Sequence, residues 1–268
     1  MSEPESEQCA AQSAIPPFND SKPARQIALI EQSFDAPAMN LALEEALLDA
    51  CETGGGGEVL RIWESPVHFA VLGVAQVLHD EVNEPACERD GVAIMRRCSA
   101  GGAVVQGLGC INYSVVLRYE NHPIAQNLRS SYCYILGTLV RAFAEAGVVV
   151  AVRGTSDLAM GDHKISGSAQ KRRKHAMLHH GTFLYDFDLA RIPTYLREPA
   201  VRPDYRGKRT HDSFVRNVPF TRNAVRGIIL TAFQCKDHVS GVAGEEVLAQ
   251  AREFAAMKYA DPAWIRRR

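Results

Sequence analysis

The chain has 268 residues, of which 46% are hydrophobic and 23% charged, and 30 basic residues balance 31 acidic ones. This is the composition of a globular protein, and the near-zero net charge argues against nucleic acid as the main partner. No run approaches the roughly eighteen apolar residues of a transmembrane helix, so we expect no membrane span. Seven cysteines, without CxxC or Cys/His spacing, indicate reduced thiols of a cytoplasmic protein instead of a disulfide framework or a zinc site.

Residues 1–25 are polar and acidic, contain proline, and lack the cationic start and apolar stretch of a signal peptide. We expect this segment to be a disordered tail. The rest of the chain, residues 26–268, shows no repeat and no second composition regime, and its length suits a single domain.

The first half of the chain predicts one helix followed by short strands. The helix begins near Pro37 and ends at the four glycines 54–57, and its apolar residues recur at helical spacing: Met39, Leu43, Ala46, Leu47 and Ala50. Residues 60–76 read as two strands separated by a proline turn, and residues 92–97 as a third strand.

The middle of the chain mixes strands and helices. Residues 111–117 alternate, which predicts a strand with one buried face and one less buried face. A helix over 128–146 and a strand over 148–152 follow. Residues 154–189 read as a loop that contains a strand at its histidine pair, and residues 203–214 as an extended polar stretch before one or two final helices. We therefore expect an α+β fold.

The stretch RRCSAGGAVV places two arginines beside a loop of small residues. Gly101 and Gly102, with Ser99 and Ala100 before them, let the backbone approach a ligand, and Arg96 or Arg97 supplies charge-assisted hydrogen bonds to a phosphate or carboxylate. We expect the paired arginines and this loop to form one wall of a pocket. The alternative is a tight turn flanked by solvated arginines. Neither a dinucleotide-binding fingerprint nor a P-loop is present.

A second group of small residues surrounds a lysine. Residues 163–170 read HKISGSAQ, and we expect Lys164 to lie beside a small-residue turn where a ligand can contact the backbone. His179 and His180 follow in HHGT, and each histidine alone is more often structural than catalytic. The run KRRKH at 171–175 reads as an exposed loop tip, with a basic nucleic-acid patch as the lesser alternative.

Together RR-x-S-x-GG-x-V, K-I-S-G-S-A-Q and H-H-G-T, preceded by W-x-x-P and G-x-x-Q, resemble the lipoate–protein ligase A family, which is related to biotin protein ligases. The resemblance covers residues 27–196. It implies an α+β fold with a mixed, largely antiparallel sheet and flanking helices, similar to class II aminoacyl-tRNA synthetases. It also implies that residues 26–268 are one catalytic domain without a C-terminal accessory domain, so a partner protein supplies that domain or the enzyme works without it.

The resemblance implies roles for particular residues. The nucleotide contacts would come from Arg97, Gly102, Ala103, Val104, Val105 and Asp157. The catalytic residue would be Lys164, which contacts both lipoate and ATP. The acyl group would lie against Ser99, Gly101, Gly167, Ala169, His180 and Gly181. The sequence departs from the family at Ala100, where glycine is usual, and at Gln106, Gly107 and Cys110, where histidine, aspartate and asparagine are common.

The reaction implied is the activation of lipoate or octanoate by ATP, which gives an acyl-adenylate and pyrophosphate, followed by transfer to a lysine of a carrier domain. The carriers would be lipoyl domains of 2-oxoacid dehydrogenases or the glycine cleavage H protein. Mg²⁺ would be held by the nucleotide's phosphates, because no carboxylate cluster and no metal ligands are visible in the sequence. The sequence names no general base for the transfer.

Three alternatives remain open. An octanoyl transferase would work through a cysteine thioester without ATP, but residues 148–163, where such a nucleophile is expected, contain no cysteine. Cys98 and Cys110 flank the Gly-rich loop without matching a nucleophile position. A biotin ligase is a second alternative, and a non-catalytic lipoyl or acyl-binding protein is the third.

Overall fold

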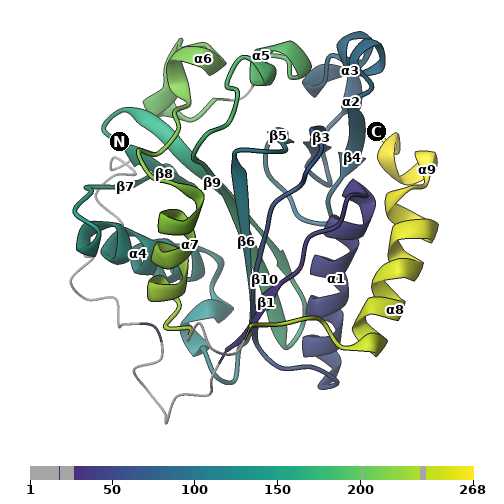
Figure 1. Cartoon of the computed structure of the whole chain (residues 1–268), viewed down its shortest axis with the longest axis vertical. Helices are drawn as coiled ribbons and strands as arrows, with labels where there is room; N and C mark the ends of the chain where they lie inside the picture. Colours follow the sequence, from purple (N-terminus) through teal and green to yellow (C-terminus); the bar gives the residue numbers. More distant parts are fainter. Residues whose placement is uncertain (1–17, 19–26, 201, 236–239) are drawn as a thin grey trace.

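The computed structural model describes residues 18, 27–200, 202–235 and 240–268 of the chain. It contains two β-sheets with helices packed against them (Figure 1). The eight-stranded sheet has the order β11-β1-β2-β6-β10-β9-β8-β7, and the three-stranded sheet has the order β4-β3-β5. Within these described ranges, no helix is both long enough and apolar enough to cross a membrane.

The larger sheet is mixed and largely antiparallel, so the predicted α+β fold is confirmed. Its strands are β1 (Ala28–Glu31), β2 (Val59–Trp63), β6 (Cys110–Arg118), β7 (Ala151–Arg153), β8 (Asp157–Met160), β9 (His163–Arg172), β10 (Ala176–Leu184) and β11 (Ser240–Gly241). β1 pairs in parallel with β2 and β11, and the strands from β2 to β7 along the sheet pair antiparallel.

The smaller sheet carries the Gly-rich segment. In it β3 (Phe69–Leu72) pairs in parallel with β4 (Ala93–Arg96) and antiparallel with β5 (Val104–Gln106). The two strands predicted around the proline turn are therefore present but belong to different sheets. Residues 97–103 connect β4 to β5, and this segment is called the Gly-rich connection below.

Helices cover both faces of the larger sheet (Figure 1). α4 (Leu128–Glu145) and α7 (Arg222–Ala232) pack on one face, and α1 (Pro37–Thr53) and α8 (Glu245–Phe254) lie on the other. Apolar side chains of the strands and helices are removed from water on both faces, which is the main favourable contribution to folding. α1 ends near its predicted position because Gly54 adopts a left-handed φ of 83°.

The remaining helices are short. They are α2 (Leu78–Glu81), α3 (Glu84–Asp90), η2 (Pro123–Gln126), α5 (Arg191–Tyr195), η3 (Asp204–Arg206), α6 (His211–Phe214), η5 (Ala255–Tyr259) and α9 (Pro262–Ile265). The predicted polar stretch over 203–214 thus contains η3 and α6. The last helices, α8, η5 and α9, follow one another to the end of the chain beside α1 (Figure 1).

Both faces of β6 are buried, which corrects the prediction of one less buried face. Tyr113 and its alternate neighbours pack under α4 and α7, while Asn112 and Ser114 point toward α1 and are only 2% and 1% exposed. The sequence could not show this, because small polar side chains on a strand are also typical of a solvated face. Here they are covered by a helix that carries buried carboxylates.

The segment 154–189 is not a loop but mainly three strands, β8, β9 and β10. The lysine motif therefore lies on β9, in the middle of the sheet, and not in a turn. The basic run at 171–175 is only partly an exposed tip. Arg172 donates to the carbonyls of η2, and Arg173 donates to Asp49 at 2.8 and 3.0 Å.

Two further expectations concern the tail and the cysteines. Phe18 lies in the predicted disordered tail, yet its ring is buried against His122, Tyr134 and Phe233, so the prediction is wrong at this residue. The rest of residues 1–25 falls outside the described part. Buried thiols that are not in disulfides are found at Cys51, Cys87, Cys98, Cys110 and Cys235. Cys133 is disulfide-bonded, so the expectation of reduced thiols is wrong there.

Candidate functional site

Two adjoining pockets open between the Gly-rich connection and strands β8 to β10. The smaller has a volume of about 120 Å³ and the larger about 390 Å³. The residues that line both pockets mark their junction, and they are Gly102, Ala103, Val104, Ser156, Asp157, Lys164, Gly167 and Thr182. The two pockets therefore meet at Lys164.

Arg97 fixes the shape of the Gly-rich connection. Its Nε donates to Ser99 Oγ at 3.0 Å, and its Nη2 donates to the carbonyls of Ala100 and Gly102 at 2.7 and 2.9 Å. Gly101 between them has a φ of 96°, which side chains disfavour. Burial lowers the pKa of Arg97 to about 10, so the guanidinium stays charged at neutral pH. Within the described residues its Nη1 has no hydrogen-bond partner.

Arg96 plays a different part, and the expectation that both arginines form the pocket wall is wrong for it. Its side chain is fully buried and lines neither pocket. Its Nη1 donates to the carbonyls of Gly73 and Gln76, and its Nε donates to the carbonyl of Ile265. Successive side chains at the end of a strand point to opposite faces, so only one of two adjacent arginines can reach the pocket.

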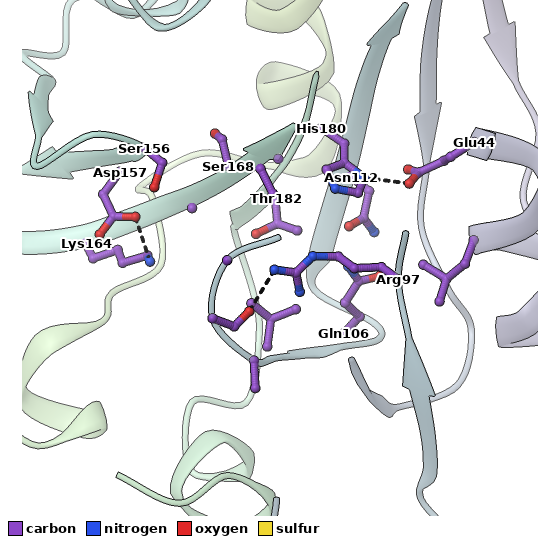
Figure 2. Close-up of a pocket in the computed structure, with 18 residues that line it drawn as sticks. Glu44, Arg97, Gln106, Asn112, Ser156, Asp157, Lys164, Ser168, His180 and Thr182 are labelled. Carbon is purple, nitrogen blue, oxygen red and sulfur yellow. Dashed lines mark hydrogen bonds and ion pairs between the residues drawn. The ribbon is translucent and has the colours of Figure 1, made fainter. Parts of the chain in front are cut away.

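A buried carboxylate on α1 closes the smaller pocket at the end away from Lys164 (Figure 2). Glu44 accepts hydrogen bonds from Trp63 Nε1 at 3.0 Å and from Ser114 Oγ. Its Oε2 lies 2.6 Å from His180 Nδ1, and His180 Nε2 lies 2.7 Å from Ser99 Oγ. Burial alone would raise the pKa of Glu44, but the charges of His180 and Arg61 and the hydrogen bonds with His180 and Ser114 together lower that pKa to about 2.

Sequence reasoning missed Glu44. It lies next to Glu45 in the otherwise apolar run LALEEALL of α1, and both glutamates are 3% exposed. Two acidic residues inside an apolar helical run were the available signal, because buried carboxylates require partners.

At the junction of the pockets, Lys164 forms an ion pair with Asp157 across β8 and β9 (Figure 2). The Nζ–Oδ1 distance is 2.8 Å, and the lysine side chain is 28% exposed. The other carboxylate oxygen accepts a hydrogen bond from Tyr205 at 2.7 Å. Burial, and then the charge of Asp157, raises the pKa of Tyr205, which keeps its hydroxyl a donor. Gly167 leaves room for the lysine, because a Cβ there would lie 2.8 Å from Nζ.

The larger pocket carries basic residues that the sequence analysis did not single out. Besides Lys164, its basic lining residues are Arg153, Arg197, Arg206 and His211. Its apolar lining residues include Ile192, Leu196, Phe214 and Val215. Arg206 is held by Glu198 through a hydrogen bond of 2.7 Å. The basic letters RGKRTH at 206–211 were the available signal, but no spacing related them to the lysine motif.

The structure brings most of the predicted residues together. Of the expected nucleotide contacts, those that line the larger pocket are Gly102, Ala103, Val104, Val105, Asp157 and Lys164. Arg97 lines only the smaller pocket. Of the expected acyl contacts, those that line the smaller pocket are Gly101, Gly167, Ala169, His180 and Gly181. Ser99 lines neither pocket and lies behind Arg97 and His180.

Of the residues that depart from the family pattern, some line a pocket and others do not. Gln106 lines the smaller pocket, and its Oε1 is buried without a hydrogen-bond partner among the described residues. Ala100 is exposed and lies outside both linings. Cys110 is also outside both linings.

Thiols and metal ligands do not gather at this site. Burial raises the pKa of Cys98 and of Cys110 to about 12, so neither is an activated thiolate at neutral pH. In the described part of the chain, no three His, Cys, Asp or Glu side chains are grouped so that they could hold a metal ion.

Comparisons with known proteins agree with this arrangement. The sequence model of the lipoyl protein ligase A/B catalytic domain matches residues 36–231. A protein of Aeropyrum pernix named lipoate-protein ligase A is 27% identical over 245 residues, which cover 86% of this chain and 89% of the relative. A protein of Mycoplasma pneumoniae with the same name is 34% identical over 161 residues, 60% of this chain and 46% of its own length.

Solved structures share the fold. The bipartite lipoate protein ligase of Thermoplasma acidophilum, studied with its E2 lipoyl domain, has a TM-score of 0.78 at 24% identity, over 91% of this chain and 97% of that one. A lipoate-protein ligase A bound with ATP has a TM-score of 0.76 at 22% identity, over 90% and 98% of the two chains. With its match over residues 36–231, the chain belongs to the lipoyl protein ligase A/B catalytic domain family.

Proposed function

We propose that this protein is an ATP-dependent lipoate–protein ligase, which activates lipoate or octanoate as an acyl-adenylate and transfers the acyl group to a lysine of a lipoyl carrier domain. The observation that carries the proposal is the position of Lys164 at the junction of a small pocket and a larger cationic one. A carboxylate in one pocket and an α-phosphate in the other would meet beside this ammonium group.

The two pockets suit the two substrates. The larger pocket combines apolar walls with cations, which fits a nucleotide base and its phosphates. The smaller pocket is narrower and ends at Glu44, Arg97 and His180, which fits an acyl chain that enters from the junction. Arg97 is thereby reassigned from nucleotide contact to the acyl pocket.

Lys164 would act by stabilising the negative charge that develops on phosphate oxygens and on the carboxylate as the mixed anhydride forms. While no phosphate is near, Asp157 balances the lysine's charge. Gly102 and Ala103 of the Gly-rich connection line the same junction, where their backbone N–H groups would offer further donors. Mg²⁺ would be carried by the nucleotide's phosphates, with Asp157 as a carboxylate at the junction, because the described residues provide no cage of their own.

The partners follow from relatives of this chain. Proteins named lipoate-protein ligase A, one of which was solved with ATP, support lipoate and ATP as substrates. The Thermoplasma ligase is bipartite and was studied with an E2 lipoyl domain, which supports a lipoyl domain of a 2-oxoacid dehydrogenase, or the similar glycine cleavage H protein, as acceptor. A separate accessory protein would complete the enzyme if it too is bipartite. The proposed use of ATP is consistent with a reaction in the cytoplasm, where ATP is abundant.

The decisive experiment is ATP–pyrophosphate exchange dependent on added lipoate or octanoate. We expect exchange with the isolated chain, or with the chain and a lipoyl accessory protein. A cysteine-thioester transferase or a non-catalytic binder would give none. The raised pKa values of Cys98 and Cys110 and their position outside both pockets argue against the transferase.

A further inference from the structure

The C-terminal segment, residues 245–268, lies beyond the part of the chain that matches the family, and it packs along α1 and reaches β4 (Figure 1). We infer that this segment is a brace, which positions the Gly-rich connection and α1 so that the two pockets bind ATP and lipoate. The inference rests on the proposed function for its kinetic readout. It names Trp264 and Arg96 as positioning residues, since neither lines a pocket.

The first contact of the brace is made at the end of β4. Trp264 Nε1 donates to the carbonyl of Arg96 at 2.8 Å, and Arg96 Nε donates to the carbonyl of Ile265 at 2.9 Å. The Arg96 main chain and side chain are thus both bonded to α9. The next residue in the chain is Arg97, whose guanidinium shapes the Gly-rich connection.

Arg96 also links α9 to residues that contact the Gly-rich connection. Its guanidinium donates to the carbonyl of Gly73 at 2.9 Å. Gly73 lies so close to the connection that a Cβ on it would be 2.0 Å from the carbonyl oxygen of Gly101. The N–H of Val74 also donates to the carbonyl of Ser99 at 2.8 Å. A shift of Arg96 would therefore move the loop on which the pocket wall rests.

The second contact of the brace is made on α1. Glu45 is 3% exposed, and its carboxylate accepts hydrogen bonds from Lys258 Nζ at 2.7 and 2.9 Å and from the Tyr259 hydroxyl at 2.7 Å. Its neighbour in the chain, Glu44, faces the pocket. Both at α1 and at the Gly-rich connection, a residue that lines the pocket is thus the sequence neighbour of a residue that the C-terminal segment binds.

The buried charge makes the first contact sensitive. The hydrogen-bond partners found for the Arg96 guanidinium within the described residues are all main-chain carbonyls. Removing the Trp264 N–H leaves the Arg96 carbonyl without this donor and frees α9, whose Ile265 carbonyl is one of the guanidinium's partners, so that Arg96 can move. Movement would be transmitted to Gly73 and Gly101, so we expect substrate binding to weaken before the fold is lost.

The test uses two substitutions of Trp264 in the full chain. Trp264→Phe removes the N–H donor but keeps a ring against Lys258, whose Nζ lies 4.4 Å from the indole centroid, and Trp264→Ala removes both. The matched control is Arg266→Ala, which changes an exposed residue of the same segment that pairs with Glu84. KM for ATP and for lipoate is measured by pyrophosphate exchange. Deuterium uptake is measured over residues 97–106.

We expect Trp264→Phe to raise KM for both substrates by about three- to tenfold, in line with the loss of one hydrogen bond, with a smaller change in kcat. Deuterium uptake over residues 97–106 should become faster. Trp264→Ala should show larger changes of both kinds, and Arg266→Ala should match the wild type.

Unchanged KM values and unchanged deuterium uptake in Trp264→Phe would overturn the inference, even if the unfolding temperature fell. That variant decides the question if Trp264→Ala does not fold. Absence of lipoate-dependent exchange in the wild type would refute the proposed function instead, and the deuterium measurement would still test the brace by itself.

Discussion

The two walls of the site hold their charged groups in different ways. On the wall formed by α1 and the Gly-rich connection, Glu44 and Arg97 are nearly fully buried, and each has several hydrogen-bond partners. On the wall formed by β8 and β9, Lys164 is 28% exposed and is held by an ion pair with Asp157. Several buried partners fix a side chain, whereas a partly exposed ion pair contributes little and is easily exchanged.

This difference indicates a division of labour. The first wall sets the shape of the acyl pocket before any substrate arrives, which reduces the entropic cost of orienting the carboxylate. The second wall supplies a positive charge that can leave Asp157 and follow the phosphate as the reaction proceeds. A site with only the first kind of wall would bind an acyl chain without activating it, so the following predictions test the two walls separately.

The largest effect is expected on the second wall. Lys164→Ala should lower lipoate-dependent pyrophosphate exchange by about 10²–10³-fold, because it removes a cation from the position where phosphate charge develops. Transfer from pre-formed lipoyl-adenylate should fall less, because the charge on the phosphate is already present. Lys174→Ala in the exposed turn between β9 and β10 is the control, and circular dichroism checks that both variants fold. Wild-type rates in both half-reactions would make Lys164 a spectator.

On the first wall, we expect the charge of Glu44 to affect how the free energy of unfolding depends on pH. The pKa of Glu44 is about 2 in the folded protein, because His180, Arg61 and Ser114 together outweigh the effect of burial, and about 4.3 in an unfolded chain. A lowered pKa contributes stability that is complete above the unfolded value and is lost as the pH falls toward the folded value.

We therefore expect the free energy of unfolding of the wild type to fall by about 2 kcal/mol more than that of Glu44→Gln between pH 6 and pH 2.5. Urea titrations at the two pH values measure this difference. Glu245→Gln, at a side chain that is 76% exposed, serves as the control. Parallel pH dependence of Glu44→Gln and wild type would show that the carboxylate is not held in its charged form by this wall.

Sequence reasoning succeeded where one segment carries its own signal. α1 and α4 were predicted because their apolar residues recur at helical spacing and glycines follow them. The lysine motif led to the prediction of Lys164 as a site residue, and the same resemblance led to the prediction of Asp157. β9 itself was missed, because its small residues have low strand propensity, and its place between β8 and β10 is set by pairing with distant segments.

The remaining site residues could not be predicted for a related reason. Arg96 and Arg97 look alike in the sequence, and which of them faces the pocket depends on which face of the smaller sheet the loop covers. Glu44 belongs to the pocket because His180 of β10, which is distant in the sequence, lies against α1 in the fold. Arg153, at the end of β7, and Arg206, in η3, are far apart in the sequence and line the same pocket only in the fold. In each of these examples, long-range packing determines which residues line the pockets, and the local sequence pattern carries little information about that packing.

A smaller effect should follow from narrowing the space around the movable lysine. In Gly167→Ala, the new Cβ would lie 2.8 Å from Lys164 Nζ and 3.0 Å from its Cε, so the flexible end of the lysine must shift. We expect adenylation to fall by roughly three- to tenfold, because a displaced charge stabilises the phosphate less well. Gly57→Ala, where an added Cβ meets nothing within 4 Å, is the matched control. An unchanged rate would mean that the present position of the lysine is not the one used in catalysis.

The smallest effect is expected in the choice between acyl chains. Arg97 Nη1 and Gln106 Oε1 are buried at the smaller pocket and have no hydrogen-bond partner among the described residues. The sulfur atoms of a dithiolane ring are weak hydrogen-bond acceptors, to which Arg97 Nη1 or the amide N–H groups of a rotated Gln106 side chain can donate, whereas the methyl end of octanoate accepts none. If the acyl chain lies with its free end here, the wild type should prefer lipoate, and Gln106→Leu should shift the ratio of kcat/KM values toward octanoate by about two- to fivefold. Gln126→Leu, at an exposed position, is the control. A shift toward lipoate in Gln106→Leu would place the free end of the acyl chain elsewhere, and this fixed wall would then serve only to hold the Gly-rich connection.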